Sequence, residues 1–214
     1  MLAHEVVYLV DDDGGVRQSI SELLKSADID VVAFESAAAF LEHGKFEQAA
    51  CLLLDLQLPE VSGLELQNRL GGNDVPPIIF ITGRNDVPST VRAMKAGALE
   101  FLLKPVPSEV LLKAIRTGIS KNRLLREERT ELAQLRERYA SLSQREREVL
   151  PLVVSGLMNK ESAAVLGIAE VTLQVHRRQI MSKMNADSLA DLVRIATRLG
   201  IPLTSRGTLR ASRR

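Results

Sequence analysis

The sequence has one cysteine, Cys51, no tryptophan, and only 3% aromatic residues among its 214 positions. A single cysteine cannot form an internal disulfide or a cysteine metal cage, so the reducing cytoplasm is the expected compartment. No apolar run approaches the roughly 18 residues that span a bilayer, and Met1 to Val10 has no basic lead before its short apolar stretch. We therefore expect a soluble protein that carries no export signal and does not enter a membrane.

The composition is that of a folded protein with a divided charge. Hydrophobic residues make up 45% of the chain and charged residues 26%, which excludes disordered and low-complexity classes; the length allows one or two domains. Residues 1–120 carry 10 Lys and Arg against 17 Asp and Glu, a net charge of −7, whereas residues 121–214 carry 18 against 10, a net charge of +8. The basic half has no aromatic residue after Tyr139 on which single-stranded bases could stack, so duplex DNA is its expected partner.

The acidic half repeats a strand, a turn and a stretch that could be helical. The expected strands are short, mainly apolar runs: Val6–Val10, Val31–Phe34, Cys51–Asp55, Ile78–Thr82 and Glu100–Leu103. Five such units predict an α/β fold with a parallel sheet that is covered on both faces and joined by right-handed crossovers. In open sheets of this kind, functional groups collect at the carboxyl ends of the strands.

Polar residues stand at four of those strand ends. They are Asp11, Asp12 and Asp13 after the first strand, Asp55 at the end of the third, Thr82 at the end of the fourth, and Lys104 after the fifth. Any one of them could be a helix cap, a strand end or a solvated charge. Together, several carboxylates in one crevice repel one another and invite a hard divalent cation, for which Mg²⁺ is the expected choice. A hydroxyl and an ammonium beside a metal-bound carboxylate can hold phosphoryl oxygens during transfer to that carboxylate.

These residues stand in four motifs: V-D-D-D, L-L-D-L-Q-L-P-E-V-S-G, F-I-T-G and F-L-L-K-P. In this order they resemble the receiver domain of two-component response regulators, over about residues 4–120. The resemblance implies a flavodoxin-like sheet with strand order 2-1-3-4-5 and Asp55 as the phosphoacceptor. The Mg²⁺ ligands that it implies are Asp11, Asp12, Asp55 and the backbone carbonyl of Gln57.

The same resemblance assigns the remaining strand-end residues. Thr82 would bind a phosphoryl oxygen and move on activation, Lys104 would pair with another oxygen, and Phe101 would change rotamer with the switch. Asp13 would be a neighbour of the metal site and not a ligand. A histidine kinase would supply the phosphoryl group, and the activated protein would form a homodimer.

Phosphatases of the haloacid-dehalogenase type are the enzymatic alternative, because they also form an aspartyl phosphate with Mg²⁺, Thr and Lys on a parallel sheet. Their nucleophile is the first Asp of a D-x-D-x-[TV] motif after the first strand, and the run from Asp11 to Gly15 lacks the final Thr or Val. A cap domain has no room before residue 120. The sequence therefore favours a regulator that is not an enzyme, for which the resemblance implies only its own phosphorylation and slow autodephosphorylation.

A stalk rich in good helix formers, Ser108–Arg138, joins the two halves. Leu125, Leu132 and Tyr139 recur every seven residues, which indicates a coiled coil, although Glu128 interrupts the intervening series. A solvated connecting helix fits the pattern equally well. Both alternatives stay open.

The basic half predicts four helices. They cover about 143–154, 159–166, 170–184 and 188–199. Ser143 and Glu146 form a capping box at the start of the first. The second and third are joined by a glycine turn at Gly167, and the third is rich in Arg and His. This arrangement predicts a helix-turn-helix.

Three strings in this half, L-S-Q-R-E-R-E-V-L, G-L-M-N-K-E-S-A and L-G-I-A-E-V-T-L-Q-V-H-R-R-Q-I-M-S-K-M, resemble the DNA-binding domain of the LuxR/NarL class, in its FixJ-like form. The resemblance covers residues 141–199 and implies that Gln174, Val175 and Arg178 face the base edges. The residues that it implies to contact or position the phosphate backbone are Thr172, His176, Arg177, Asn159 and Lys160.

Three positions depart from this class. Gln174 stands where Lys is frequent and Val171 where Lys or Arg is frequent, so the charge available to the phosphate backbone is reduced. Ala169 removes the usual hydroxyl cap of the recognition helix.

The patterns together predict a receiver domain over residues 1–120, a helical linker over 121–140, a helix-turn-helix domain over 141–203 and a basic tail over 204–214 that is expected to be disordered. The predicted function is cytoplasmic transcription regulation: a histidine kinase phosphorylates Asp55, and the protein dimerises and binds a two-fold-related site in duplex DNA. The alternative is a DNA-binding interaction protein whose output is independent of phosphorylation. The complete set of acidic-pocket residues counts against that alternative.

Overall fold

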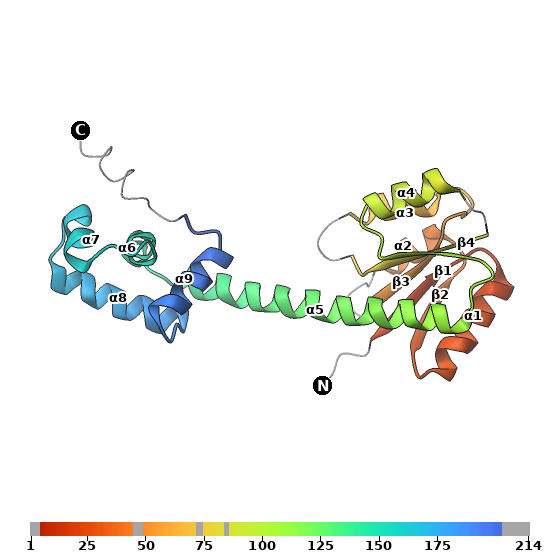
Figure 1. Ribbon diagram of the computed structural model, residues 1–214, viewed down its shortest axis with the longest axis horizontal. Coiled ribbons are helices and arrows are strands. Elements are labelled where there is room, and N and C mark those ends of the chain that lie inside the picture. Colours follow the sequence, from red (N-terminus) through yellow and green to blue (C-terminus); the bar gives the residue numbers. More distant parts are fainter. Residues whose placement is uncertain (1–4, 45–48, 72–74, 84–85, 203–214) are drawn as a thin grey trace. The chain divides into compact units, whose positions relative to one another are not determined.

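The computed structural model describes residues 5–44, 49–71, 75–83 and 86–202. The chain divides into two compact units, residues 1–126 and 127–214 (Figure 1), and each is described by itself. The tail predicted over 204–214 lies outside the described residues. Among the described residues, none of the helices has the length and apolarity needed to cross a bilayer.

The first unit is built on a five-stranded parallel sheet. Its strands are β1 (Val6–Val10), β2 (Asp30–Phe34), β3 (Ala49–Asp55), β4 (Ile78–Thr82) and β5 (Glu100–Leu103). The strand order is β2-β1-β3-β4-β5, and every neighbouring pair is parallel. The predicted fold class is confirmed, and the strands begin and end within two residues of the predicted limits.

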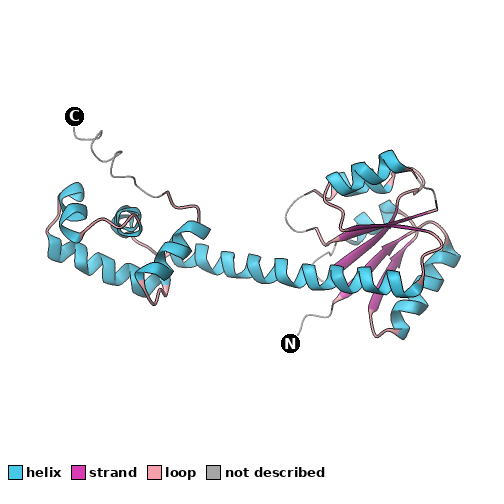
Figure 2. Ribbon diagram, in the orientation of Figure 1, coloured by secondary structure: helices cyan, strands magenta, loops and turns pink. Residues whose placement is uncertain are grey.

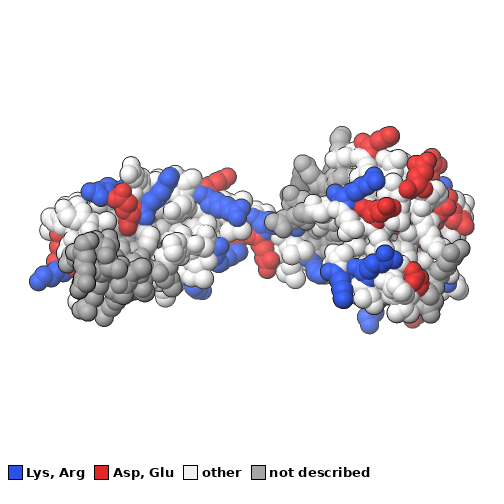
Figure 3. All heavy atoms as spheres, turned by 90° about the horizontal axis from the view of Figure 1, so that it is seen from above, with Lys and Arg blue, Asp and Glu red and all other residues white. Residues whose placement is uncertain are grey.

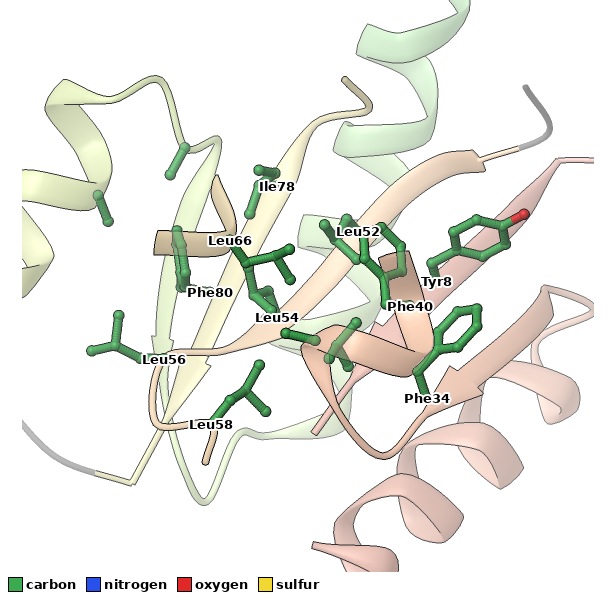
Figure 4. Close-up of a cluster of buried hydrophobic side chains, with 14 of the residues drawn as sticks. Tyr8, Phe34, Phe40, Leu52, Leu54, Leu56, Leu58, Leu66, Ile78 and Phe80 are labelled. Atoms are coloured by element: carbon green, nitrogen blue, oxygen red, sulfur yellow. The ribbon is translucent and has the colours of Figure 1, made fainter. Parts of the chain in front are cut away.

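Helices cover both faces of this sheet (Figure 2). They are α1 (Gly14–Ser26), α2 (Ala37–His43), α3 (Gly63–Arg69), α4 (Val87–Lys95) and α5 (Ser108–Ala140). Alternate strand residues point to opposite faces. Val7 and Leu9 therefore pack with residues of α1 and α5, whereas Tyr8 and Val10 pack with residues of α2, α3 and α4. Figure 4 shows the second of these cores, with Phe40 and Leu66 over the sheet.

The only cysteine of the sequence is buried where α5 packs closely on β3. A Cβ added at Gly118 would lie 2.7 Å from Cys51 Sγ, so only glycine allows this approach. Burial raises the pKa of the Cys51 thiol to about 12. The thiol is therefore protonated and unreactive at neutral pH.

In the second unit, the residues that the structure describes form four further helices. They are α6 (Gln144–Val154), α7 (Asn159–Leu166), α8 (Glu170–Met184) and α9 (Leu189–Arg198). Their limits agree with the sequence prediction to within one residue, and the Ser143–Glu146 capping box is confirmed. The core combines α6, α7, α8 and α9 with Leu135 and Tyr139 of α5. The last turns of α5 thus belong to the packing of the second unit, and its Glu131 pairs with Arg198 of α9.

Candidate functional site

The order of the strands brings the predicted acidic pocket together at one edge of the sheet. Asp11 follows β1, Asp55 and Thr82 end β3 and β4, and Lys104 follows β5. These four strands are consecutive neighbours in the sheet, so their carboxyl ends meet. Asp11, Asp55 and Thr82 are almost completely buried, although all three are polar.

Lys104 joins the two buried carboxylates. Its Nζ donates to Asp11 Oδ2 at 2.6 Å and to Asp55 Oδ2 at 2.7 Å. The backbone amide of Lys104 also donates to the carbonyl of Thr82 at 2.8 Å, which fixes the start of the loop after β5 beside β4. Charge-assisted bonds of this length hold the ammonium between the carboxylates.

The electrostatics of the pocket reflect its burial. Burial raises the pKa of Asp11, against the opposing hydrogen bond from Lys104. Burial would lower the pKa of Lys104, but its hydrogen bonds to Asp11 and Asp55 outweigh this and raise it. Burial thus disfavours the ionised form of Asp11 even with Lys104 beside it.

The third carboxylate completes a possible cation site. Asp11, Asp12 and Asp55 can each offer one oxygen such that all three oxygens lie within 4.8 Å of one another, and Asp12 is exposed at the rim. Carboxylate oxygens are the ligands that Mg²⁺ prefers, and a divalent cation would offset their negative charge. The residues present therefore fit Mg²⁺.

The backbone amides of two neighbours, Gln57 and Asp13, donate to carboxylates of the pocket. The amide of Gln57 donates to Asp55 Oδ1 at 2.9 Å, which leaves each Asp55 oxygen with a hydrogen-bond donor. Asp13 caps α1 by accepting bonds from the amides of Gly15 and Val16, and these bonds lower its pKa. The Asp13 side chain therefore serves as a helix cap, while its backbone amide donates to Asp11 Oδ1 at 3.0 Å.

Phe101 lies on β5 next to an exposed apolar face. Its half-buried ring packs against Phe80 of β4, with the ring centroids 6.4 Å apart. On α4 and β5, large apolar side chains are left exposed: Val87, Val91, Met94 and Leu103. The buried residues of α4 are the small Ser89 and Ala93, so this helix buries little apolar area against the sheet.

The second candidate site is the pair α7 and α8. Gly167, at φ +66°, ends α7 in the left-handed region and lets the chain turn directly into α8. Ala169 precedes α8, and among the described residues no side chain caps this helix start, as predicted. Leu173, Ile180 and Met184 anchor α8 in the core.

The residues predicted to face bases lie on the outer side of α8. Gln174, Val175, Arg178 and Thr172 are exposed, whereas His176 and Arg177 are half-buried. Lys160 is exposed on α7. Arg177 Nη1 donates to Asn159 Oδ1 at 3.0 Å. Two residues that were predicted to contact the DNA phosphate backbone therefore bond to each other between α7 and α8. Figure 3 shows one face, on which basic and acidic side chains lie over both units.

Sequence reasoning missed two residues that support these sites. Lys183 of α8 donates to the buried Glu146 at 2.7 Å and thereby ties α8 to the start of α6. Gly63 lies against the Asp55 carbonyl, where an added Cβ would come within 2.3 Å. The S-x-x-E pattern predicts the capping role of Glu146, but no local pattern links Glu146 to a lysine 37 positions away.

Two protein families match this chain. The response regulator receiver domain matches residues 7–116, and the luxR family of bacterial regulatory proteins matches residues 140–196. Nodulation protein W of Bradyrhizobium diazoefficiens is 45% identical over 197 residues, which cover 92% of this chain and 87% of that protein.

Solved structures give the same result. The response regulator StyR is 49% identical with a TM-score of 0.81, and the match covers 91% of this chain and 99% of that one. Full-length FixJ from B. japonicum is 37% identical with a TM-score of 0.56, covering 92% and 98%. The chain therefore belongs to the FixJ-like two-component response regulators, transcriptional regulators in which a receiver domain precedes a luxR-type DNA-binding domain.

Proposed function

We propose that a histidine kinase phosphorylates this protein on Asp55, and that phosphorylation promotes homodimers that bind a two-fold-related site in duplex DNA. The observation that carries the proposal is the bridge from Lys104 to Asp11 and Asp55 at the carboxyl edge of the sheet. This cluster offers a carboxylate nucleophile, a cation and an oxygen-rich metal site in one buried place. Because the target is DNA, the proposed compartment is the cytoplasm.

The phosphoryl transfer uses groups that lie at the same edge of the sheet. An Asp55 carboxylate oxygen attacks the phosphorus of a phosphohistidine; the P–O bond forms as the P–N bond breaks, and the histidine nitrogen keeps the bonding pair. Lys104 exchanges its Asp55 contact for a phosphoryl oxygen, and the Thr82 hydroxyl binds another. When bound by Asp11, Asp12, Asp55 and the Gln57 carbonyl, Mg²⁺ would supply positive charge to the phosphoryl oxygens. Slow attack of water on the phosphorus breaks its bond to the Asp55 oxygen, releases inorganic phosphate and restores the Asp55 carboxylate.

The exposed face of α4 and β5 is the proposed dimer surface. Movement of Thr82 toward the phosphoryl group vacates space toward which the Phe101 ring can turn. Thr82 is also paired in the sheet with Leu103 of this face. Since α4 buries only small side chains, its displacement exposes little additional apolar area. The phosphoryl group then biases an equilibrium between two arrangements of α4.

Phosphorylation is expected to increase dimer affinity without making dimerisation all-or-none. The available free energy is the difference in phosphoryl binding between the two arrangements, which limits the shift in population. Sedimentation velocity with and without a phosphoryl mimic measures the monomer fraction, and Val91→Asp on the exposed α4 face should reduce the dimer. An unchanged monomer fraction would exclude this route.

The DNA-binding unit is expected to separate base contacts from phosphate contacts. Gln174→Ala should cost about 1 to 3 kcal/mol on the preferred site and relax the preference at one base pair per half-site, because an amide can pair with adenine N7 and N6. Lys160→Ala should weaken all duplexes alike and reduce the salt dependence by roughly one counterion. Selection from random duplexes with both variants tests this; identical preferences for wild type and Gln174→Ala would contradict a base-reading role.

A further inference from the structure

Two exposed valines, Val171 and Val175, lie on the side of α8 that faces away from the core. This side is called the outermost stripe of α8. Leu173, Ile180 and Met184 define the buried side of the helix. Val171 and Val175 each lie two positions from Leu173, and two steps of about 100° place them on the opposite side of the helix. Val171 is 71% exposed and Val175 46% exposed. From the sequence, Val171 was interpreted only as a lost backbone charge; the structure places it on the face directed away from the core.

The position of Val171 along α8 fits contact with bases. It is the second residue of the helix. In helix-turn-helix proteins the N-terminal residues of the recognition helix approach the base edges of the major groove. Arg178 continues the same stripe one turn beyond Val175, and exposed Gln174 flanks it. The two valines therefore share the exposed side of α8 with an arginine suited to guanine and a glutamine suited to adenine, and this setting favours DNA over an apolar protein partner.

We propose that Val171 and Val175 recognise two thymine C5-methyl groups in the major groove of each half-site. Thymine methyl is the apolar group that the major groove presents, and no other base pair edge offers it. Four residues of helix span about 6 Å, close to two base-pair steps of about 3.4 Å each. The inference rests on the proposed binding of DNA through α8 and specifies what that helix reads.

Replacement of thymine by uracil tests the proposal, because uracil lacks the methyl group and keeps the pairing. The full-length phosphorylated protein would first select its preferred duplex from a random pool. Each thymine of that duplex would then be replaced by uracil, and affinities would be measured for wild type, Val171→Ala and Val175→Ala. The control is Val110→Ala, which removes a valine that is 45% exposed in the first unit.

Wild type and the control should lose about fourfold in affinity at two positions per half-site, since one buried methyl is worth about that factor. Val171→Ala should become insensitive to uracil at one position and Val175→Ala at the other. Specific binding by wild type that is unaffected by uracil at every position would overturn this inference alone, as would full uracil sensitivity in both variants. Failure to select any duplex would instead overturn the proposed function.

Discussion

Asp55→Asn is expected to abolish phosphorylation of the protein completely. The substitution replaces the carboxylate by an amide of the same shape, which keeps the fold but cannot form an acyl phosphate. Wild type incubated with Mg²⁺ and a small phosphodonor should gain one phosphoryl group that is stable to acid and labile to hydroxylamine. Intact-mass measurement before and after hydroxylamine treatment follows the gain and the loss.

Asp12→Ala is the matched control, because Asp12 is exposed at the rim while Asp11 and Asp55 remain in place. This variant should still be phosphorylated on Asp55, but it should require more Mg²⁺. Chelation of divalent cations should stop the reaction in wild type and variant alike. Stoichiometric labelling of Asp55→Asn on another aspartate would show that the acidic pocket has been assigned incorrectly, and would return the first-loop aspartates to consideration as nucleophiles.

Gly63→Ala is expected to destabilise the first unit by about 3 kcal/mol and to impair phosphorylation with it. The new Cβ would lie 2.3 Å from the carbonyl oxygen of Asp55, 3.0 Å from the Phe80 ring and 3.1 Å from the Leu56 Cα. Two of these neighbours are backbone atoms of the segment that carries Asp55, so relief of the clash must move the phosphoacceptor. Thermal unfolding and the initial rate of labelling measure the two effects.

Gly14→Ala provides the comparison. It also adds a methyl group close to the acidic pocket, but the added Cβ would lie 3.6 Å from Arg17 Nη2, an ordinary van der Waals distance. Gly14 begins α1, where alanine is the better helix former, so this variant should be at least as stable as wild type. Equal stability of Gly63→Ala and Gly14→Ala would mean that the loop after β3 can retreat without cost, and the proposed link between Gly63 and Asp55 would be wrong.

Much of the architecture was determined by local sequence. The apolar runs that end in Asp11, Asp55 and Thr82 predicted strands, and those strands form where they were expected. The Ser143–Glu146 capping box located the start of α6, and Gly167 located the turn before α8. Such signals act within a few residues, because they depend on hydrogen bonds at helix ends and on the periodicity of the buried face.

The contacts that make the sites were decided by the tertiary structure. Lys104 bonds to Asp11 and Asp55, which are 93 and 49 positions away, and this contact requires β1, β3, β4 and β5 to be neighbours. The close approach of Gly63 to Asp55 likewise depends on how the loop after β3 folds back. A local pattern shows which side chains can face a core or a crevice, but the free energy of each contact depends on which distant segment packs opposite. Which distant segments pack together is determined by the whole chain. This packing places Lys104 between two carboxylates and directs Val171 away from the core.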